Sequence, residues 1–472
     1  MLYEGGAAGA TGLCLWEVQG RGQLDLGAVT TSAAGSEDIA FEVPAGTGSF
    51  TVVLEDDDGL RLGARRLVAP DGTVVLNADD EASDLNPGTV YVGVASVLVP
   101  SGDDPRAGAI PGRWTLRVAT YALDDTLGVT PIPGNVERIR VLTEPVGVEG
   151  GAVDLHLSFS PALGVSFTAP SADAWVTALL GRVAAYLERA HLVLGTVTFA
   201  HLGGHDEVPD GNAARALCTA ASSTGLAGRS VNLFLVQDLA FTSGFSGGIP
   251  GPPETWQSPG SGIVLESMGS GDATGILAAH ELFHFMGLRH TTELSGGGRD
   301  PLSDTPECPR GTSLESCPDY GNLMFPSFPL RGDLDVSAAQ TAVLWHSPWA
   351  HRVVRGACGG GMLFDVTGPD RAILEVASLP AGPAGCGAQA GGLVFRPPTQ
   401  EALSISVRTD ADLTLAVGTA CGDASAGCVE VAAGTARVLE VPAPVTGPVF
   451  VALHRASSSE GGWVDVRFTR AP

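Results

Sequence analysis

The chain has 472 residues, which is too long for one ordinary hydrophobic core, so two or three domains are expected. Its formal net charge of −26 argues against binding to nucleic acid or to acidic membrane surfaces. Hydrophobic residues make up 44% and charged residues only 17%, a composition typical of a globular protein. No run approaches the roughly 20 apolar residues of a transmembrane helix.

Residues 1–130 are rich in short β-prone runs that Gly, Pro and Asp separate, at 49–54, 73–76, 90–94 and 113–118. This spacing predicts an antiparallel β-sandwich. The Pro-Ile-Pro-Gly run from Pro131 to Gly134 is typical of a linker. We therefore expect the first domain to end at residue 130.

Residues 131–355 mix strand and helix patterns. Residues 153–159 alternate as a strand, and further strands are expected at 196–199, at 231–236 and from Gly262 to Glu266. Between them, one face of a helix carries apolar side chains, at Trp175, Leu179, Val183 and Leu187. The sheet is therefore expected to be mixed, with one antiparallel edge.

Residues 356–472 return to strand patterns, because Leu403, Ile405 and Val407 alternate with polar residues and so do Leu413, Leu415 and Val417. A second small β-sandwich is expected there, similar to the prepeptidase-C-terminal type. The fold class expected for the whole chain is α+β, with a central domain between two all-β sandwiches.

The most informative segment, residues 280–290, reads H-E-x-x-H-x-x-G-x-x-H. His280 and His284 are four residues apart, so on a helix they project from the same face. Glu281 is rotated by about 100° around that helix and lies beside the metal without ligating it. Gly287 ends the helix, because glycine adopts the left-handed backbone conformation at little energetic cost. The chain then turns so that His290 reaches the metal as a third ligand. Three protein ligands with one open position are typical of catalytic zinc.

A structural alternative exists for the same residues. The helix around the motif is apolar nearly all round, which predicts burial in a core. Its histidines would then simply be satisfied by ordinary hydrogen bonds. The joint presence of Glu281, Gly287 and His290 at the required spacing favours zinc instead.

The motif resembles that of the metzincin zinc metallopeptidases. Tyr-Gly-Asn-Leu-Met-Phe-Pro, residues 320–326, is similar to the methionine turn of that family, with Met324 beneath the metal and a matrixin-like sequence. The segment between the third histidine and this turn carries an Asp-Thr-Pro element followed by two cysteines. This arrangement resembles the pappalysin branch of the family. The resemblance covers roughly residues 150–355 and implies that the domain at 131–355 is a metzincin catalytic domain.

Two binding expectations follow from the resemblance. Pappalysins bind calcium in this region, and carboxylates in a loop supply the oxygen ligands that Ca²⁺ needs, so the candidates are Asp300, Asp304, Thr305 and Asp319. The strand from Gly262 to Glu266 is implied to be the upper edge strand. An extended protein or peptide substrate would pair with it.

The function implied by the resemblance is that of a secreted zinc-dependent metalloendopeptidase. Zn²⁺ held by His280, His284 and His290 would lower the pKa of a bound water towards about 7. Glu281 would take the proton as general base and pass it to the leaving amine. A non-catalytic surface or adhesion protein that binds through its β-sandwiches is the alternative, and a non-peptide substrate also remains open. The N-terminal domain is either a pro-region or a permanent companion.

The eight cysteines, an even number, favour disulfides in an exported protein, so an extracellular or cell-surface location is expected. Residues 1–4 do not resemble a signal peptide. Plausible local pairs are Cys308–Cys317 and Cys421–Cys428. The remaining four, Cys14, Cys218, Cys358 and Cys386, allow three connectivities, of which we favour the one with Cys358–Cys386. Reduced buried thiols are the alternative.

Overall fold

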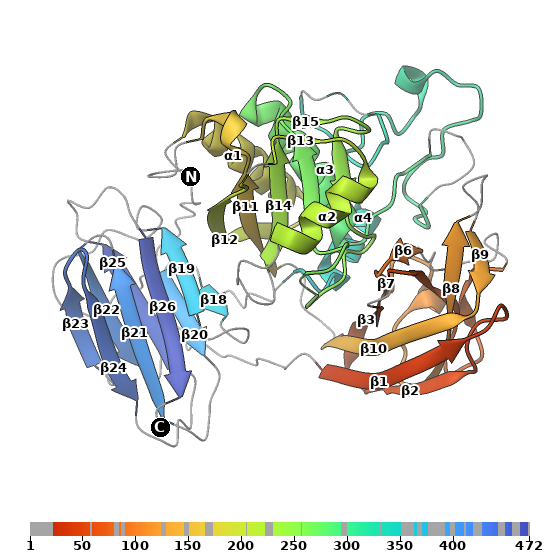
Figure 1. The fold of residues 1–472 in the computed structure, drawn as a ribbon, viewed down its shortest axis with the longest axis horizontal. Helices are drawn as coiled ribbons and strands as arrows, with labels where there is room; N and C mark the ends of the chain where they lie inside the picture. The colour runs from red at the N-terminus through yellow and green to blue at the C-terminus, as the bar shows by residue number, and fades with distance from the viewer. Residues whose placement is uncertain are drawn as a thin grey trace.

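The computed structural model describes most of the chain from residue 22 to residue 470. The described residues are 22–56, 59–79, 85, 90–123, 129–145, 151–165, 173–203, 205–221, 230–255, 257–293, 300–327, 329, 332–350, 363–365, 371–375, 392–396, 402–409, 412–418, 427–441, 449–455 and 463–470. They form a sheet-rich α+β protein with few helices (Figure 1). We call residues 22–145 the N-terminal β unit, residues 151–350 the central unit and residues 363–470 the C-terminal β unit.

The N-terminal β unit consists of two antiparallel sheets around one core. The first has the order β1 (Gly22–Thr31), β10 (Gly134–Pro145), β3 (Thr47–Glu55) and β7 (Val94–Val99). The second has the order β2 (Ile39–Val43), β8 (Gly112–Leu123), β4 (Arg61–Val68) and β5 (Val74–Asn77); β6 (Tyr91–Val92) pairs with β4 and β9 (Val129–Ile132) with β8. A 3₁₀ helix, η2, spans Pro105–Ala107. Between the sheets, Phe50 packs edge-on against Trp114 with 4.9 Å between ring centroids.

Strand pairing extends this unit past the expected boundary at residue 130. β10 lies between β1 and β3, and its side chains at Val136, Ile139 and Val141 are buried in the core between the sheets. The expected linker residues Pro131 and Ile132 therefore lie in β9 and Gly134 begins β10, so that only Pro133 connects the two strands. Proline at 131 and 133 gives a linker-like pattern, yet β9 pairs on one side only, and prolines are tolerated at such an edge.

The central unit contains a five-stranded sheet with the order β12 (Leu192–His201), β11 (Gly151–Phe159), β14 (Ser230–Val236), β17 (Ile263–Glu266) and β16 (Gly244–Ser246). The first four strands are parallel, and β16 pairs antiparallel with β17. A short ladder joins β13 (Glu207–Val208) to β15 (Asp238–Leu239). The helices are α1 (Ala174–Arg189), α2 (Gly211–Ala221), α3 (Gly271–Met286) and α4 (Ala338–His346), with 3₁₀ helices η3 (Pro161–Leu163) and η6 (Leu314–Ser316).

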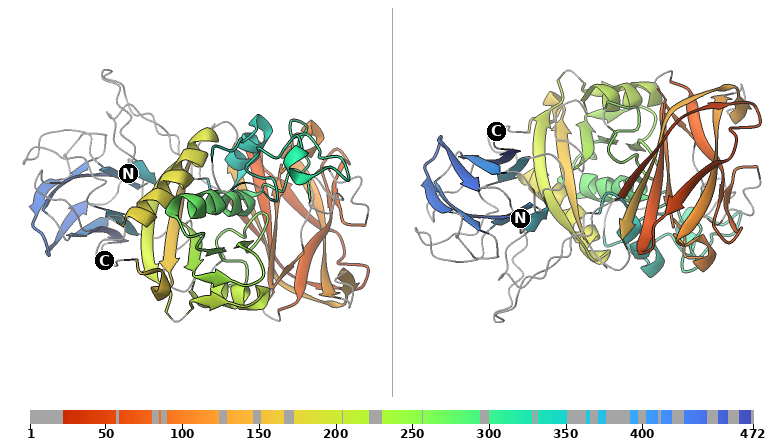
Figure 2. Two further views of the ribbon diagram at one scale, coloured as in Figure 1. Left: turned by 90° about the horizontal axis from the view of Figure 1, so that it is seen from above. Right: turned by 90° about the horizontal axis from the view of Figure 1, so that it is seen from below.

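Side chains on the sheet alternate between two cores. Leu233 and Leu235 of β14 face the core that contains α1 and α3, whereas Phe234 and Val236 face α2. Helices α1 and α3 cross closely on one face of the sheet, as Figure 2 shows. The crossing requires glycine in α3, because a Cβ at Gly275 would come within 2.6 Å of the Leu179 carbonyl oxygen.

The expectation that the strand from Gly262 to Glu266 forms the sheet edge is wrong. That strand, β17, pairs with β14 on one side and with β16 on the other. The antiparallel edge strand is β16, which has only three residues. Such a short strand carries no recognisable alternation, so the sequence pattern missed it.

The C-terminal β unit again contains two sheets. One has the order β18 (Leu363–Asp365), β20 (Gly392–Arg396), β25 (Val449–Arg455), β22 (Leu413–Gly418) and β23 (Gly427–Val431); the other has β19 (Arg371–Glu375), β26 (Trp463–Arg470), β21 (Leu403–Thr409) and β24 (Ala436–Val441). The expected alternation is present, since Ile405, Val407, Leu413, Leu415 and Val417 are all buried. The expected domain boundary at residue 355 lies outside the described residues.

The cysteines only partly follow the expected pattern. Cys308 and Cys317 form a disulfide, as predicted. Cys218 is a buried free thiol on α2, which corrects the expectation that all eight cysteines pair; burial raises its pKa to about 12. Cys428 is disulfide-bonded, whereas Cys14, Cys358, Cys386 and Cys421 lie outside the described residues. No helix among the described residues has the length and apolar character needed to cross a membrane.

Candidate metal centre

Helix α3 presents the first two histidines from a fully enclosed position. Ser270 caps its N-terminus, accepting a hydrogen bond from the Ala273 amide at 3.1 Å. Every residue from 274 to 286 is buried, as the apolar sequence predicts. The helix ends at Gly287, whose φ of 121° is one that side chains rarely adopt. This glycine turns the chain towards His290.

The three motif histidines converge. Their ring centroids lie 4.5 Å apart for His280 and His284, 4.6 Å for His284 and His290, and 5.4 Å for His280 and His290. One nitrogen from each ring lies within 4.8 Å of the others. Two nitrogens on a single Zn²⁺ are at most about 4.2 Å apart, so the three rings converge to the spacing that one ion requires.

Backbone carbonyls orient the two helical imidazoles. Nδ1 of His280 lies 2.6 Å from the Leu323 carbonyl oxygen, and Nδ1 of His284 lies 2.7 Å from that of Leu288. Because a carbonyl oxygen only accepts, Nδ1 carries the proton in each ring and Nε2 carries the lone pair. This is the tautomer that a metal ligand requires.

A carboxylate orients the third imidazole. Both oxygens of Glu293 lie 3.1 Å from Nδ1 of His290, and this hydrogen bond lowers the Glu293 pKa. Metal-ligating histidines commonly donate their other ring N–H to a carboxylate. Glu293 was not predicted from the sequence, although an acid three residues after the third histidine was available as a signal.

Burial keeps the helical imidazoles neutral. It lowers the pKa of His280 to about 3 and holds the pKa of His284 well below its usual value, and neighbouring histidines add to both shifts. A protonated imidazole cannot bind a metal, so a buried and neutral pair is ready to coordinate one. The donor set therefore fits a zinc ion.

Glu281 lies beneath the edge strand. The side chain is buried, and burial raises its pKa to about 8. Gly244 of β16 lies directly against it, because a Cβ at that position would come within 2.7 Å of the Glu281 Cδ. A dication held by the adjacent imidazoles would oppose the effect of burial and favour the carboxylate. Gly244 was not predicted from the sequence.

The segment 320–326 joins both ligand-bearing parts. Its Leu323 carbonyl accepts from His280, and its Met324 carbonyl accepts from the Thr291 amide at 3.1 Å. Met324 is completely buried in the core of the central unit. The segment therefore contacts the helix and also the residue that follows His290.

The three carboxylates among the four calcium candidates accept hydrogen bonds from different groups. Asp300 accepts from the Thr305 hydroxyl at 2.6 Å, and Asp304 accepts from the Ser337 hydroxyl and the Ala339 amide at the N-terminus of α4. Asp319 accepts from the hydroxyls of Thr291 and Thr292, at 2.6 Å and 2.8 Å. Among the described residues, these carboxylates do not form one cluster, and the calcium site stays a prediction.

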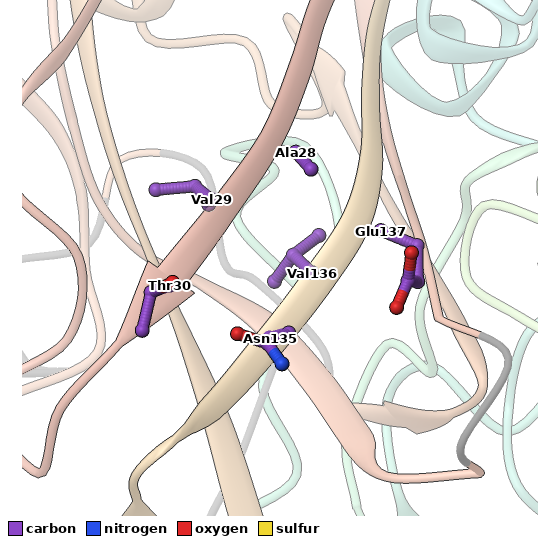
Figure 3. Close-up of a pocket in the computed structure, with 6 residues that line it drawn as sticks. All are labelled: Ala28, Val29, Thr30, Asn135, Val136 and Glu137. Atoms are coloured by element: carbon purple, nitrogen blue, oxygen red, sulfur yellow. The ribbon is translucent and has the colours of Figure 1, made fainter.

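Two cavities bear on the location of the site. One of about 160 Å³ adjoins the His290 loop and is lined by residues that include Thr292, Glu293, the Cys308–Cys317 disulfide, Phe325 and Pro326. The other, of about 180 Å³, lies where β1 and β10 shift register and contains Glu137 as its single titratable group (Figure 3). The cavity in Figure 3 contains none of the candidate metal ligands, which lie in the histidine cluster.

Comparisons with known proteins add little to this geometry. No protein-family model matches the chain, and no curated protein matches it. Among solved structures, it is similar to mature mirolysin of Tannerella forsythia in complex with a cleaved peptide, with a TM-score of 0.29 and 15% identity over 43% of this chain and 92% of that chain. It is also similar to metalloproteinase-II of Bacteroides fragilis, with a TM-score of 0.29 and 12% identity over 45% of this chain and 63% of that chain.

Proposed function

We propose that this protein is a zinc-dependent metalloendopeptidase of the metzincin type. The convergence of His280, His284 and His290, with the buried Glu281 next to the first of them, carries the proposal. Three imidazoles, each with Nδ1 against an acceptor and Nε2 free to coordinate, form a donor set suited to one Zn²⁺. The burial of Met324, and the hydrogen bond from the Thr291 amide to its carbonyl, support its proposed role in a methionine turn.

The edge strand β16 supports a peptide as the substrate. One side of β16 is paired with β17, so an extended peptide adds to the other side through backbone hydrogen bonds. A peptide so bound passes Gly244 and therefore lies over Glu281. The cavity beside Thr292, Phe325 and Pro326 would then receive one of its side chains.

The metal and Glu281 have separate roles in the proposed reaction. Zn²⁺, when bound, supplies Lewis-acid polarisation of a carbonyl and lowers the pKa of a water. Glu281 removes a proton from the attacking water and then gives it to the leaving amine, so its carboxyl must exchange a proton twice in each turnover. Burial beneath β16 keeps bulk water from that carboxyl.

Two further parts of the assignment are proposals. The β units on either side of the catalytic part are proposed to be sandwich domains, the C-terminal one of the prepeptidase-C-terminal type. An extracellular or cell-surface location is proposed because the Cys308–Cys317 disulfide is favoured by an oxidising compartment.

The test is cleavage of a mixed peptide library by the zinc-loaded protein, alongside Glu281→Gln and the exposed control Glu42→Gln. We expect the control to cleave as wild type does, and Glu281→Gln to retain zinc but lose at least 100-fold in kcat, the lower range for general-base removal. Cleavage by Glu281→Gln at the wild-type rate would contradict the mechanism. No cleavage by any zinc-loaded form would instead favour a binding protein.

A further inference from the structure

One strand of the N-terminal β unit is buried on both of its faces. In β7, Val97 and Val99 point into the core of their own unit. Leu98 points the other way and is buried in the core of the central unit, together with residues of α3. Side chains alternate along a strand, so β7 contributes to two hydrophobic cores at once.

Leu98 contacts the turn that ends α3. Its Cδ2 lies 3.0 Å from the position that a Cβ on Gly287 would occupy, and Pro250 and Val343 lie within 4 Å of that position. The turn is also held to the helix, since the Leu288 amide donates to the Phe283 carbonyl at 2.9 Å. The turn at Gly287 is thus packed against apolar side chains, one of which, Leu98, belongs to the N-terminal β unit.

A loop between β16 and β17 completes this enclosure. The buried Ser96 hydroxyl of β7 donates to the Pro250 carbonyl at 2.5 Å. The next residue, Gly251, donates its amide to the Phe285 carbonyl at 2.8 Å in the last turn of α3. Ser96 therefore connects to the end of the metal-bearing helix through a chain of two hydrogen bonds, which satisfies a carbonyl that a helix end leaves unpaired.

A buried arginine holds the same loop farther along. The Arg140 side chain of β10 is 4% exposed and pairs with Glu55 of its own unit at 2.7 Å. It also lies 3.5 Å from the Glu254 carboxylate and 3.4 Å from the Pro253 carbonyl oxygen of the loop. Removing the loop from Arg140 would leave a buried charge with fewer partners, which is strongly unfavourable.

We propose that the N-terminal β unit is a permanent support of the metal centre, in which Leu98 and Ser96 are positioning residues for the turn that carries the third histidine. A removable pro-region would leave Val94, Ser96 and Leu98 exposed on departure, although each is 1% exposed in the structure. Among the described residues, the metal-ligand cluster contains no residue of this unit.

The inference rests on zinc binding by the proposed peptidase, and its test uses zinc affinity in place of activity. In the full-length chain, Leu98→Ala is expected to weaken the Zn²⁺ dissociation constant by about tenfold, as measured by competition with a chelator, because loosening a support of a ligand has effects of this order. Val97→Ala is the matched control, since Val97 is the adjacent residue on the same strand and faces away from the central unit. It should bind zinc within about twofold of wild type.

Ser96→Ala is a milder variant in case Leu98→Ala does not fold. Its control is Ser49→Ala, which removes another buried hydroxyl that donates to the central unit, at the His346 carbonyl, away from Gly287. We expect weaker zinc binding for Ser96→Ala alone. Equal zinc affinity in Ser96→Ala, Ser49→Ala and wild type would overturn the positioning role. Weakened zinc binding in a protein that cleaves no peptide would retain this inference and reject the proposed function.

A second experiment tests permanence. A site-specific protease sequence is inserted between Pro145 and Gly151, where the strands of the two units end and begin. After cleavage, the two fragments are expected to co-elute in gel filtration and to separate only in denaturant. Release of the N-terminal fragment in buffer, with zinc retained by the remainder, would show that the unit is a detachable pro-region.

Discussion

Gly244 of the edge strand lies against Glu281 of the metal-bearing helix, so closely that a Cβ at position 244 would come within 2.7 Å of the Glu281 Cδ. Residue 244 therefore limits where the general base can be. A side chain at this position must push either β16 or the carboxyl out of place. This contact joins the surface that would hold the peptide to the group that would move the proton.

Replacement of Gly244 by alanine should therefore impair catalysis without removing the metal. For Gly244→Ala we expect kcat to fall by at least tenfold, about 1.4 kcal/mol in the barrier, while the zinc content is unchanged. The control is Gly181→Ala on α1, where a Cβ meets nothing within 4 Å and alanine suits a helix better. Full activity of Gly244→Ala would show that the carboxyl has more room than the structure gives it.

Glu293 should contribute to zinc affinity through His290. In Glu293→Gln, the carboxylate that accepts from Nδ1 at 3.1 Å becomes a neutral amide, so the imidazole is a weaker and less oriented ligand. The expected cost is about 10- to 100-fold in the Zn²⁺ dissociation constant, measured by chelator competition. The exposed Glu315→Gln should bind zinc normally. Unchanged affinity in Glu293→Gln would mean that the contact does not persist in the metal-bound protein.

Zinc should also stabilise the folded chain. Zn²⁺ at 100 times its dissociation constant is expected to add about 2.7 kcal/mol to the free energy of unfolding, provided that the unfolded chain does not bind it. His284→Ala should lose this increment, and His205→Ala, at an exposed position, should keep it. Thermal melts with and without a chelator measure the difference. A zinc-dependent shift of the same size in His284→Ala would place the ion elsewhere.

His156 on β11 should make stability depend on pH. Burial lowers its pKa from 6.5 to about 4. Below pH 6.5 the unfolded chain therefore binds a proton that the folded chain does not bind. The stabilisation is complete above pH 6.5 and is lost as the pH falls towards 4. Between pH 7 and pH 5 the loss is about 2 kcal/mol. His156→Gln should reduce the pH dependence by that amount in urea titrations, and an unchanged slope would contradict this assignment.

Local patterns predicted several elements correctly, for a clear physical reason. The four-residue spacing of His280 and His284 matches the helical repeat, and the glycine at 287 matches a turn that other residues rarely adopt. Alternation predicted β21 and β22, because one face of each strand is buried. In these cases the information lies within a few neighbouring residues.

Other features depend on which strand ends up beside which, and local patterns do not specify that. The edge position of β16, the role of β10 in the N-terminal β unit and the burial of Leu98 in a second core each follow from pairing between distant segments. Glu293, which contacts His290, was close enough to the motif in sequence to have been found.

By itself, the sequence determined which side chains share a helix face and where the chain must turn, since backbone periodicity and the freedom of glycine are local properties. These local properties identified the three histidines and Glu281 as candidate site residues. Only the tertiary structure decided what lies opposite them: Gly244 over the carboxyl, Leu323 and Glu293 on the imidazoles, and Leu98 against the turn. Packing joins residues far apart in the chain, and no local repeat records those contacts.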